Sequence, residues 1–135
     1  MQVESQGSAQ DGNALRGKRG LQRILNATRY SADGLRAAWQ HEDAFRQEVA
    51  LAAVLIPVGL FLPVGVVEKI LLIGVVVLVL IVELLNSGIE AAVDRDSLEI
   101  NPLGKRAKDI GSAAVMLSLL LAGGTWTAIL AAHYF

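Results

Sequence analysis

The sequence predicts an all-α membrane protein, in which an amphipathic N-terminal surface helix precedes three transmembrane helices that form a bundle. Two runs, residues 49–67 and 110–132, contain no charged side chain at all, and a third run, residues 70–82, continues into a stretch with acidic residues. A helix needs roughly 20 apolar residues to cross a bilayer core. A soluble helical bundle is the weaker alternative, because its helices would keep a polar stripe that the first and last runs lack.

The chain divides into a short tail and one membrane domain. Residues 1–20 are polar and glycine-rich, and we expect them to form a disordered tail, because they contain no apolar run like that of a secretory signal. We expect residues 21–135 to form a single domain. Its surface helix should span about 21–41, and its membrane spans about 46–64, 67–94 and 106–133. Pro63 and Gly65, followed by Glu68 and Lys69, predict a tight turn between the first two spans.

The composition excludes several functions. Hydrophobic residues make up 53% of the chain, and the net charge is −1, so the chain lacks the basic surplus of a nucleic-acid binder. It has no cysteine, which excludes disulfides, thiol catalysis and cysteine-bound zinc. We therefore expect the membrane, and no nucleic acid, among its partners.

The distribution of lysine and arginine predicts the orientation in the membrane. One basic residue, Lys69, lies between the first two spans, and none follows the third. The others precede the first span or lie between the second and third: Arg16, Lys18, Arg19, Arg23, Arg29, Arg36, Arg46, Arg95, Lys105, Arg106 and Lys108. Because positive residues stay in the cytoplasm, the N-terminus should be cytoplasmic and the C-terminus should lie on the opposite side.

The surface helix has an apolar face. Its apolar residues Leu21, Ile24, Leu25, Leu35 and Trp39 can share that face, and arginines contribute charge. Such a segment is typical of a helix that lies on the membrane surface, with its tryptophan at headgroup depth.

The second span contains the chemically informative pattern. Glu83, Asn86, Glu90 and Asp94 recur at helical spacing and cover an arc of roughly 80° on one face. An acidic residue at the centre of a membrane helix costs about 2.5 kcal/mol or more, so a function is the favoured explanation. Polar packing between helices is the alternative explanation. For Asp94, which lies beside Arg95 and nearer water, a function and polar packing explain the residue equally well.

Charged groups flank this stripe on the cytoplasmic side. Glu42, Asp43, Arg46 and Glu48 precede the first span, and Lys105, Arg106, Lys108 and Asp109 precede the third. Carboxylates suit Mg²⁺, and basic groups suit phosphate oxygens. The combination indicates phosphoryl transfer to or from a lipid. Residues 12–18, GNALRGK, resemble a phosphate loop, but Arg19 replaces its hydroxyl residue and no strand precedes it, so we interpret them as a basic tail near anionic headgroups.

From about Arg23 onward the chain closely resembles the small bacterial membrane diacylglycerol kinases. The resemblance rests on GLRAAW at 34–39, AFRQE at 44–48, VELLNSGIEAAVDR at 82–95 and GKRAKDIGSAAV at 104–115. The related undecaprenol kinases share the motif of the central helix, whereas the second and fourth strings favour the diacylglycerol branch.

The resemblance implies a homotrimer in the bacterial inner membrane, with a periplasmic C-terminus and active sites composed of residues from neighbouring subunits. It implies transfer of the γ-phosphoryl group of ATP, with Mg²⁺, to diacylglycerol, which gives phosphatidate. Glu83 would be the general base, and Glu42 and Glu90 would bind the metal. The residues that would bind ATP or substrate are Arg23, Tyr30, Glu42, Glu48, Asn86, Glu90, Lys108 and Asp109.

Two other functions remain open at this point. An undecaprenol kinase would perform the same reaction on a polyprenol, and only the lipid distinguishes it. A non-enzymatic scaffold or ion-conducting oligomer would also explain acidic residues within a membrane.

Overall fold

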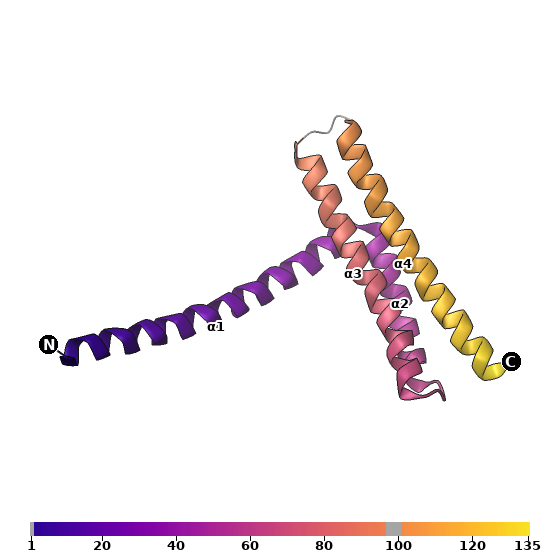
Figure 1. Cartoon of the computed structure of the whole chain (residues 1–135). Coiled ribbons are helices and arrows are strands. Elements are labelled where there is room, and N and C mark those ends of the chain that lie inside the picture. The colour runs from indigo at the N-terminus through magenta and orange to yellow at the C-terminus, as the bar shows by residue number, and fades with distance from the viewer. Residues whose placement is uncertain (1, 97–100) are drawn as a thin grey trace. The chain divides into compact units, whose positions relative to one another are not determined.

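The computed structural model describes residues 2–96 and 101–135, and it places nearly all of them in four helices (Figure 1). In chain order these are α1 (Gln2–His41), α2 (Asp43–Phe61), α3 (Val66–Asp96) and α4 (Pro102–Tyr134). Helices α2, α3 and α4 are each long and apolar enough to cross a membrane. The three predicted spans and the all-α class are therefore confirmed, and these helices begin and end within a few residues of the expected bounds.

The chain forms two compact units, which are described separately, and the first of them ends at Ala37. In this unit α1 is helical from Gln2, whereas the sequence led us to expect a disordered tail over residues 1–20, of which Met1 lies outside the described residues. The segment has no proline to stop a helix. Its glycines at 12, 17 and 20 would each cost about 1 kcal/mol relative to alanine, which weakens the helix without blocking it sterically.

Within the second unit, a break at Glu42 separates the end of α1 from α2. Glu42 has extended backbone angles, φ −118° and ψ 108°, and thus interrupts the helical path. Arg46 bridges the break: its guanidinium donates to the carbonyl oxygens of Trp39 (2.8 Å) and Gln40 (3.3 Å) and pairs with Asp43. These bonds satisfy carbonyls that a helix end leaves free, and they hold Glu42 at the start of the first span.

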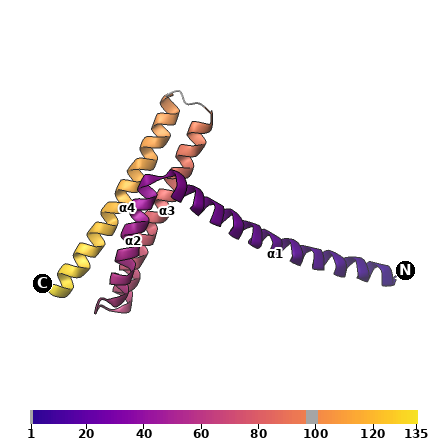
Figure 2. The ribbon, with the colours of Figure 1, turned by 180° about the vertical axis from the view of Figure 1, so that it is seen from behind.

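Helix α3 is the centre of the membrane bundle, because it packs against both α2 and α4 (Figures 1 and 2). Leu72 on α3 is completely buried, and the buried residues Val75, Val76 and Val79 follow it on the same face. Small buried residues of α2, Ala52 and Gly59, allow that helix to approach.

A hydrogen bond joins α3 and α4 across the bundle. The indole Nε1–H of Trp126 donates to the carbonyl oxygen of Leu72 at 3.0 Å. That carbonyl lies within α3. Because a lipid environment offers no water to the indole, this bond satisfies its donor within the protein.

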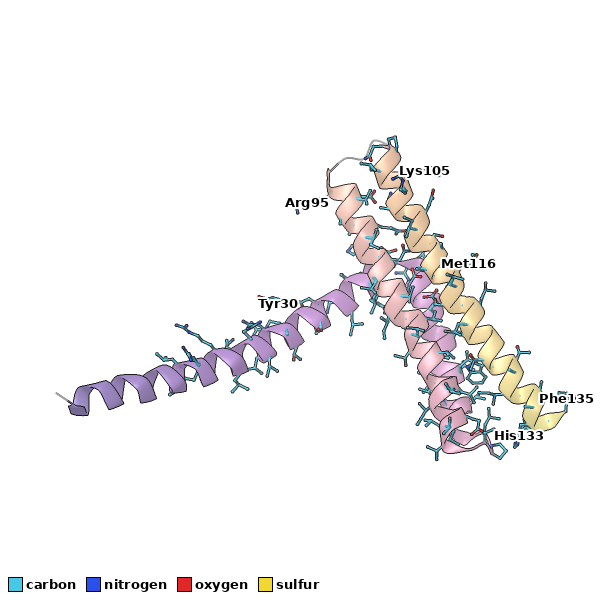
Figure 3. The ribbon with its side chains drawn as sticks, viewed as in Figure 1. Tyr30, Arg95, Lys105, Met116, His133 and Phe135 are labelled. Carbon is cyan, nitrogen blue, oxygen red and sulfur yellow. The ribbon has the colours of Figure 1, made fainter. Side chains whose placement is uncertain are left out.

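Defined residues stabilise both ends of the bundle. At one end Lys69 Nζ donates to the carbonyl oxygen of Leu60 (2.8 Å), where α2 turns into α3. At the other end Asn101 caps α4, since its side chain accepts from the backbone N–H of Gly104 at 2.7 Å. Arg95 and Lys105 lie at this second end, whereas His133 and Phe135 lie at the first (Figure 3).

Candidate functional site

The buried face of α3 changes from apolar to polar at Glu83. The apolar positions Leu72, Val75 and Val79 lead at helical spacing to Glu83, which retains 4% of its exposure. One turn further, Asn86 and Ser87 each retain 9%. Polar groups thus occupy positions that would otherwise extend the core of a membrane bundle.

Four carboxyl groups gather around this point, and we call them the acidic cluster: Glu42, Glu48, Glu83 and Glu90. Glu48 on α2 and Glu83 on α3 are direct neighbours, and the charges of Glu42 and Glu90 act on Glu83. Glu48 Oε2 is buried and has no hydrogen-bond partner. Over residues 2–96 and 101–135 no member of the cluster forms an ion pair. The cluster therefore has no ion-pair partner in this part of the chain, and its charge would be balanced by protonation or by a bound cation.

The cluster is not a complete metal site by itself. In the part of the chain that the structure describes, no three acidic or histidine side chains come close enough to hold an ion together. Any metal bound here would need oxygen ligands from a second molecule in addition to one or two of these carboxylates.

Asn86 of α3 packs against α4 at Gly111. Gly111 of α4 is buried against it, and a methyl group at position 111 would overlap Asn86 Oδ1. Asn86 Oδ1 and Ser87 Oγ are both buried without a hydrogen-bond partner. The absence of a side chain at Gly111 thus allows the amide to occupy this position.

Cationic groups lie near the same end of the bundle. Lys108 of α4 forms an ion pair with Asp94 of α3 at 2.7 Å, and the charge of Glu90 also acts on it. Lys105 pairs with Asp109 one turn away at 2.6 Å. All four of these side chains are at least two-fifths exposed, so the pairs are open to solvent and to solutes.

An apolar cavity of about 250 Å³ borders the acidic cluster at Glu48. Leu51, Ala52 and Leu55 of α2 line it, together with Val76 and Val79 of α3 and Leu119, Ala122, Gly123 and Trp126 of α4. Glu48 is the only ionisable residue of this lining. The structure therefore places a carboxylate next to a space that suits a hydrocarbon chain.

The structure brings together most of the residues that the sequence singled out. Glu48 and Glu83 are neighbours, and the charges of Glu42 and Glu90 act on Glu83. Asn86 lies one turn beyond Glu83 on the same buried face, and the charge of Glu90 acts on Lys108. Asp109 pairs with Lys105. Arg23 and Tyr30 are exposed on α1 in the N-terminal unit, which is described by itself (Figure 3).

Sequence reasoning missed the contributions of Ser87 and Gly111. Ser87 adjoins the polar stripe in sequence, and its place on the buried face could have been read from the helical spacing. Gly111 gave no such signal, because its role depends on which residue of α3 faces it.

Replacing Gly111 with alanine should destabilise the bundle. The added methyl group would displace the Asn86 side chain from a buried position, and overpacking of this kind costs about 1–3 kcal/mol. Unfolding of the purified protein by increasing sodium dodecyl sulfate, followed by circular dichroism, measures the effect. Gly124→Ala is the matched control, because nothing lies within 4 Å of a Cβ at that position of α4. Equal stability of both variants would show that α3 and α4 do not meet at Asn86.

Comparison with known proteins shows the family of the chain. The sequence pattern of the prokaryotic diacylglycerol kinases matches residues 29–130. A diacylglycerol kinase of Pseudomonas aeruginosa is 56% identical over 116 residues, which cover 86% of this chain and 94% of the relative. The diacylglycerol kinase of Escherichia coli (strain K12) is 47% identical over 85% of this chain and 94% of its own length. The diacylglycerol kinase of Haemophilus influenzae is also 47% identical, over 82% of this chain and 94% of the relative. The chain therefore belongs to the prokaryotic diacylglycerol kinase family.

Proposed function

We propose that the protein is a membrane lipid kinase that transfers the γ-phosphoryl group of ATP to the hydroxyl group of diacylglycerol and so forms phosphatidate. The observation that carries this proposal is the acidic cluster around the buried Glu83, between an apolar cavity and an end of the bundle with exposed lysines. The relatives in Pseudomonas aeruginosa and Escherichia coli are diacylglycerol kinases. A site that joins hydrocarbon space, carboxylates and phosphate-binding cations fits a lipid alcohol and a nucleotide.

Glu83 is the general base in this proposal. Phosphoryl transfer through a loose transition state chiefly needs alignment, charge neutralisation and a group that accepts the hydroxyl proton. Glu83 is the most buried carboxyl of the acidic cluster and borders Glu48, which lines the cavity. A diacylglycerol with an acyl chain in that cavity would present its hydroxyl group to Glu48 and Glu83. Asn86 orders this region, because Gly111 confines it.

Lys108 and Asp109 contact or order the nucleotide. The exposed ammonium group of Lys108 lies near Glu90 and can exchange its carboxylate partner for a phosphate oxygen. Asp109 holds Lys105 in the same region. Arg23 and Tyr30 complete the proposed binding set from α1.

Mg²⁺ fits the acidic cluster as the metal of this reaction. Mg²⁺ usually binds one or two carboxylates together with substrate phosphates, which suits a cluster that cannot hold an ion with three protein ligands. The unpaired carboxylates around Glu83, and the buried oxygen of Glu48 without a partner, also favour a cation. We assign Glu42 and Glu90 as its protein ligands. When bound, the ion would neutralise part of the phosphate charge.

Assembly and orientation belong to the same proposal. In the candidate spanning stretch of α4 only 6% of residues are buried within the chain, which leaves surface for copies of the chain as well as for lipid. We propose a homotrimer with composite sites, in the bacterial inner membrane. The distribution of basic residues supports a cytoplasmic N-terminus and a periplasmic C-terminus.

ATP-dependent phosphorylation of diacylglycerol by the purified protein in mixed micelles tests the function. We expect phosphatidate when Mg²⁺ is present and a loss of turnover when it is chelated. A parallel assay with undecaprenol tests which lipid is the substrate. Faster turnover of the polyprenol would show that it, rather than diacylglycerol, is the preferred substrate. If neither lipid is phosphorylated, the proposed function is wrong, and the scaffold or ion-conducting alternative takes its place.

Glu83→Gln should lower turnover by about 10²- to 10⁴-fold, because an amide cannot accept the hydroxyl proton, and the protein should stay folded. The measurement is the initial rate of phosphatidate formation, with circular dichroism as the check on folding. Glu68→Gln is the matched control, since that carboxylate is exposed on α3 near the opposite end of the bundle. A folded Glu83→Gln variant that keeps full turnover would contradict the assigned base.

Asp94→Asn should lower the KM for ATP by up to about fivefold and leave kcat nearly unchanged, because the phosphate no longer has to displace a carboxylate from Lys108. The ion pair with Lys108 is half exposed, and such pairs contribute at most about 1 kcal/mol, which sets the size of the effect. Asp94→Glu should keep the original KM, because it keeps the charge. If Asp94→Asn instead raises the KM, Asp94 orients Lys108 for the nucleotide rather than competing with it.

A further inference from the structure

The middle of α1 contains a run of basic residues without an acidic one. Between Asp11 and Asp33 there is no aspartate or glutamate, whereas basic side chains recur along this stretch at Arg16, Lys18, Arg19, Arg23 and Arg29. All five of these side chains are exposed. The segment therefore presents concentrated positive charge to its surroundings, in a chain whose net charge is −1.

Exposed apolar residues follow one side of the same helix. Leu21, Ile24, Leu25 and Leu35 are each 50–64% exposed, and at helical spacing they fall within an arc of roughly 100°. The basic residues fall on the remainder of the circumference. A helix with one apolar stripe and flanking lysines and arginines is typical of a segment that lies in the headgroup region of a membrane.

The most N-terminal of these charges lie outside the kinase family's common sequence. The family match begins at residue 29, so Arg16, Lys18 and Arg19 precede it. Only Glu42 separates α1 from the membrane span α2, so the basic segment is tethered to the bilayer through the rest of α1. At that place the abundant ligand of opposite charge is an acidic lipid headgroup.

We propose that residues 15–25 of α1 bind an anionic lipid surface, with Arg16, Lys18 and Arg19 contacting acidic headgroups and Leu21, Ile24 and Leu25 entering the boundary with the acyl chains. This property goes beyond the proposed kinase function and does not depend on it. Each basic residue near such a surface favours the bound helix roughly fivefold, so the three together favour it roughly a hundredfold. With neutral lipids, only the burial of the apolar side chains favours the bound helix.

A single label on the apolar face tests this proposal without measuring kinase activity. The chain has no cysteine, so Thr28→Cys, at the centre of the apolar arc, gives one attachment site for a nitroxide. The labelled full-length protein is reconstituted in bilayers of phosphatidylcholine alone and of equal parts phosphatidylcholine and phosphatidylglycerol. We expect the label to be much less accessible to a water-soluble relaxation agent in the anionic bilayer, and 1 M salt should remove most of the difference, because the Debye length then falls to about 3 Å.

Charge variants distinguish the proposed contacts from a general effect of the lipid. Arg16→Gln, Lys18→Gln and Arg19→Gln combined should abolish the difference between the two bilayers, whereas Arg16→Lys with Arg19→Lys should preserve it. A label at Phe135→Cys, at the other end of the chain, should report no lipid dependence. The proposal is wrong if the position-28 label is equally accessible in both bilayers, or if the triple glutamine variant keeps the full difference.

Discussion

The burial of the Glu83 carboxyl group on the packed face of α3 is the constraint on which the rest of this structure depends. A membrane helix is most stable when its buried face is apolar, and α3 obeys that rule from Leu72 to Val79. At Glu83 the buried face of α3 is no longer apolar, although an acidic residue within a membrane span is energetically costly. Helix α2 adds to the charge by placing Glu48 beside Glu83. No cationic side chain of the described residues pairs with these two acids, so they are balanced either by protonation or by a bound species of opposite charge.

The packing of the neighbouring helices keeps these groups enclosed. Association in a membrane depends on close contact, because lipid tails are as apolar as the side chains that they would replace. Gly59 and Ala52 bring α2 against α3, and Gly111 brings α4 against Asn86. Trp126 joins α4 to the backbone of α3 beside the apolar cavity. The small residues thus determine where the polar stripe is covered and where it borders open space.

The sequence predicted the features of this structure that depend only on residues near one another in the chain. Uncharged runs predicted the spans, and the spacing of Glu83, Asn86 and Glu90 predicted that they share a face, because both depend only on helix geometry. Contacts between helices depend on how each helix is rotated, which one sequence does not specify. Gly111 against Asn86 and Lys108 with Asp94 are contacts of this kind. Helix α1 begins at Gln2, within the segment for which the sequence led us to expect a polar tail, and the lack of proline there leaves a helix sterically possible.

The lysines and the acids at the site differ in whether they already form ion pairs. This difference suits the binding of a nucleotide together with its cation. The lysines of α4 already have carboxylate partners, but those pairs are largely exposed and therefore cost little to break. Among the described residues the acids of the cluster form no ion pair, and one oxygen of Glu48 is buried without a hydrogen-bond partner. A polyphosphate that arrives with a divalent cation would supply both missing charges at once. Its phosphates would replace Asp94 at Lys108, and its cation would offset the carboxylates around Glu83. A free phosphate without the cation would add negative charge to an acidic cluster, so the cluster itself favours a metal-bound nucleotide over a bare one.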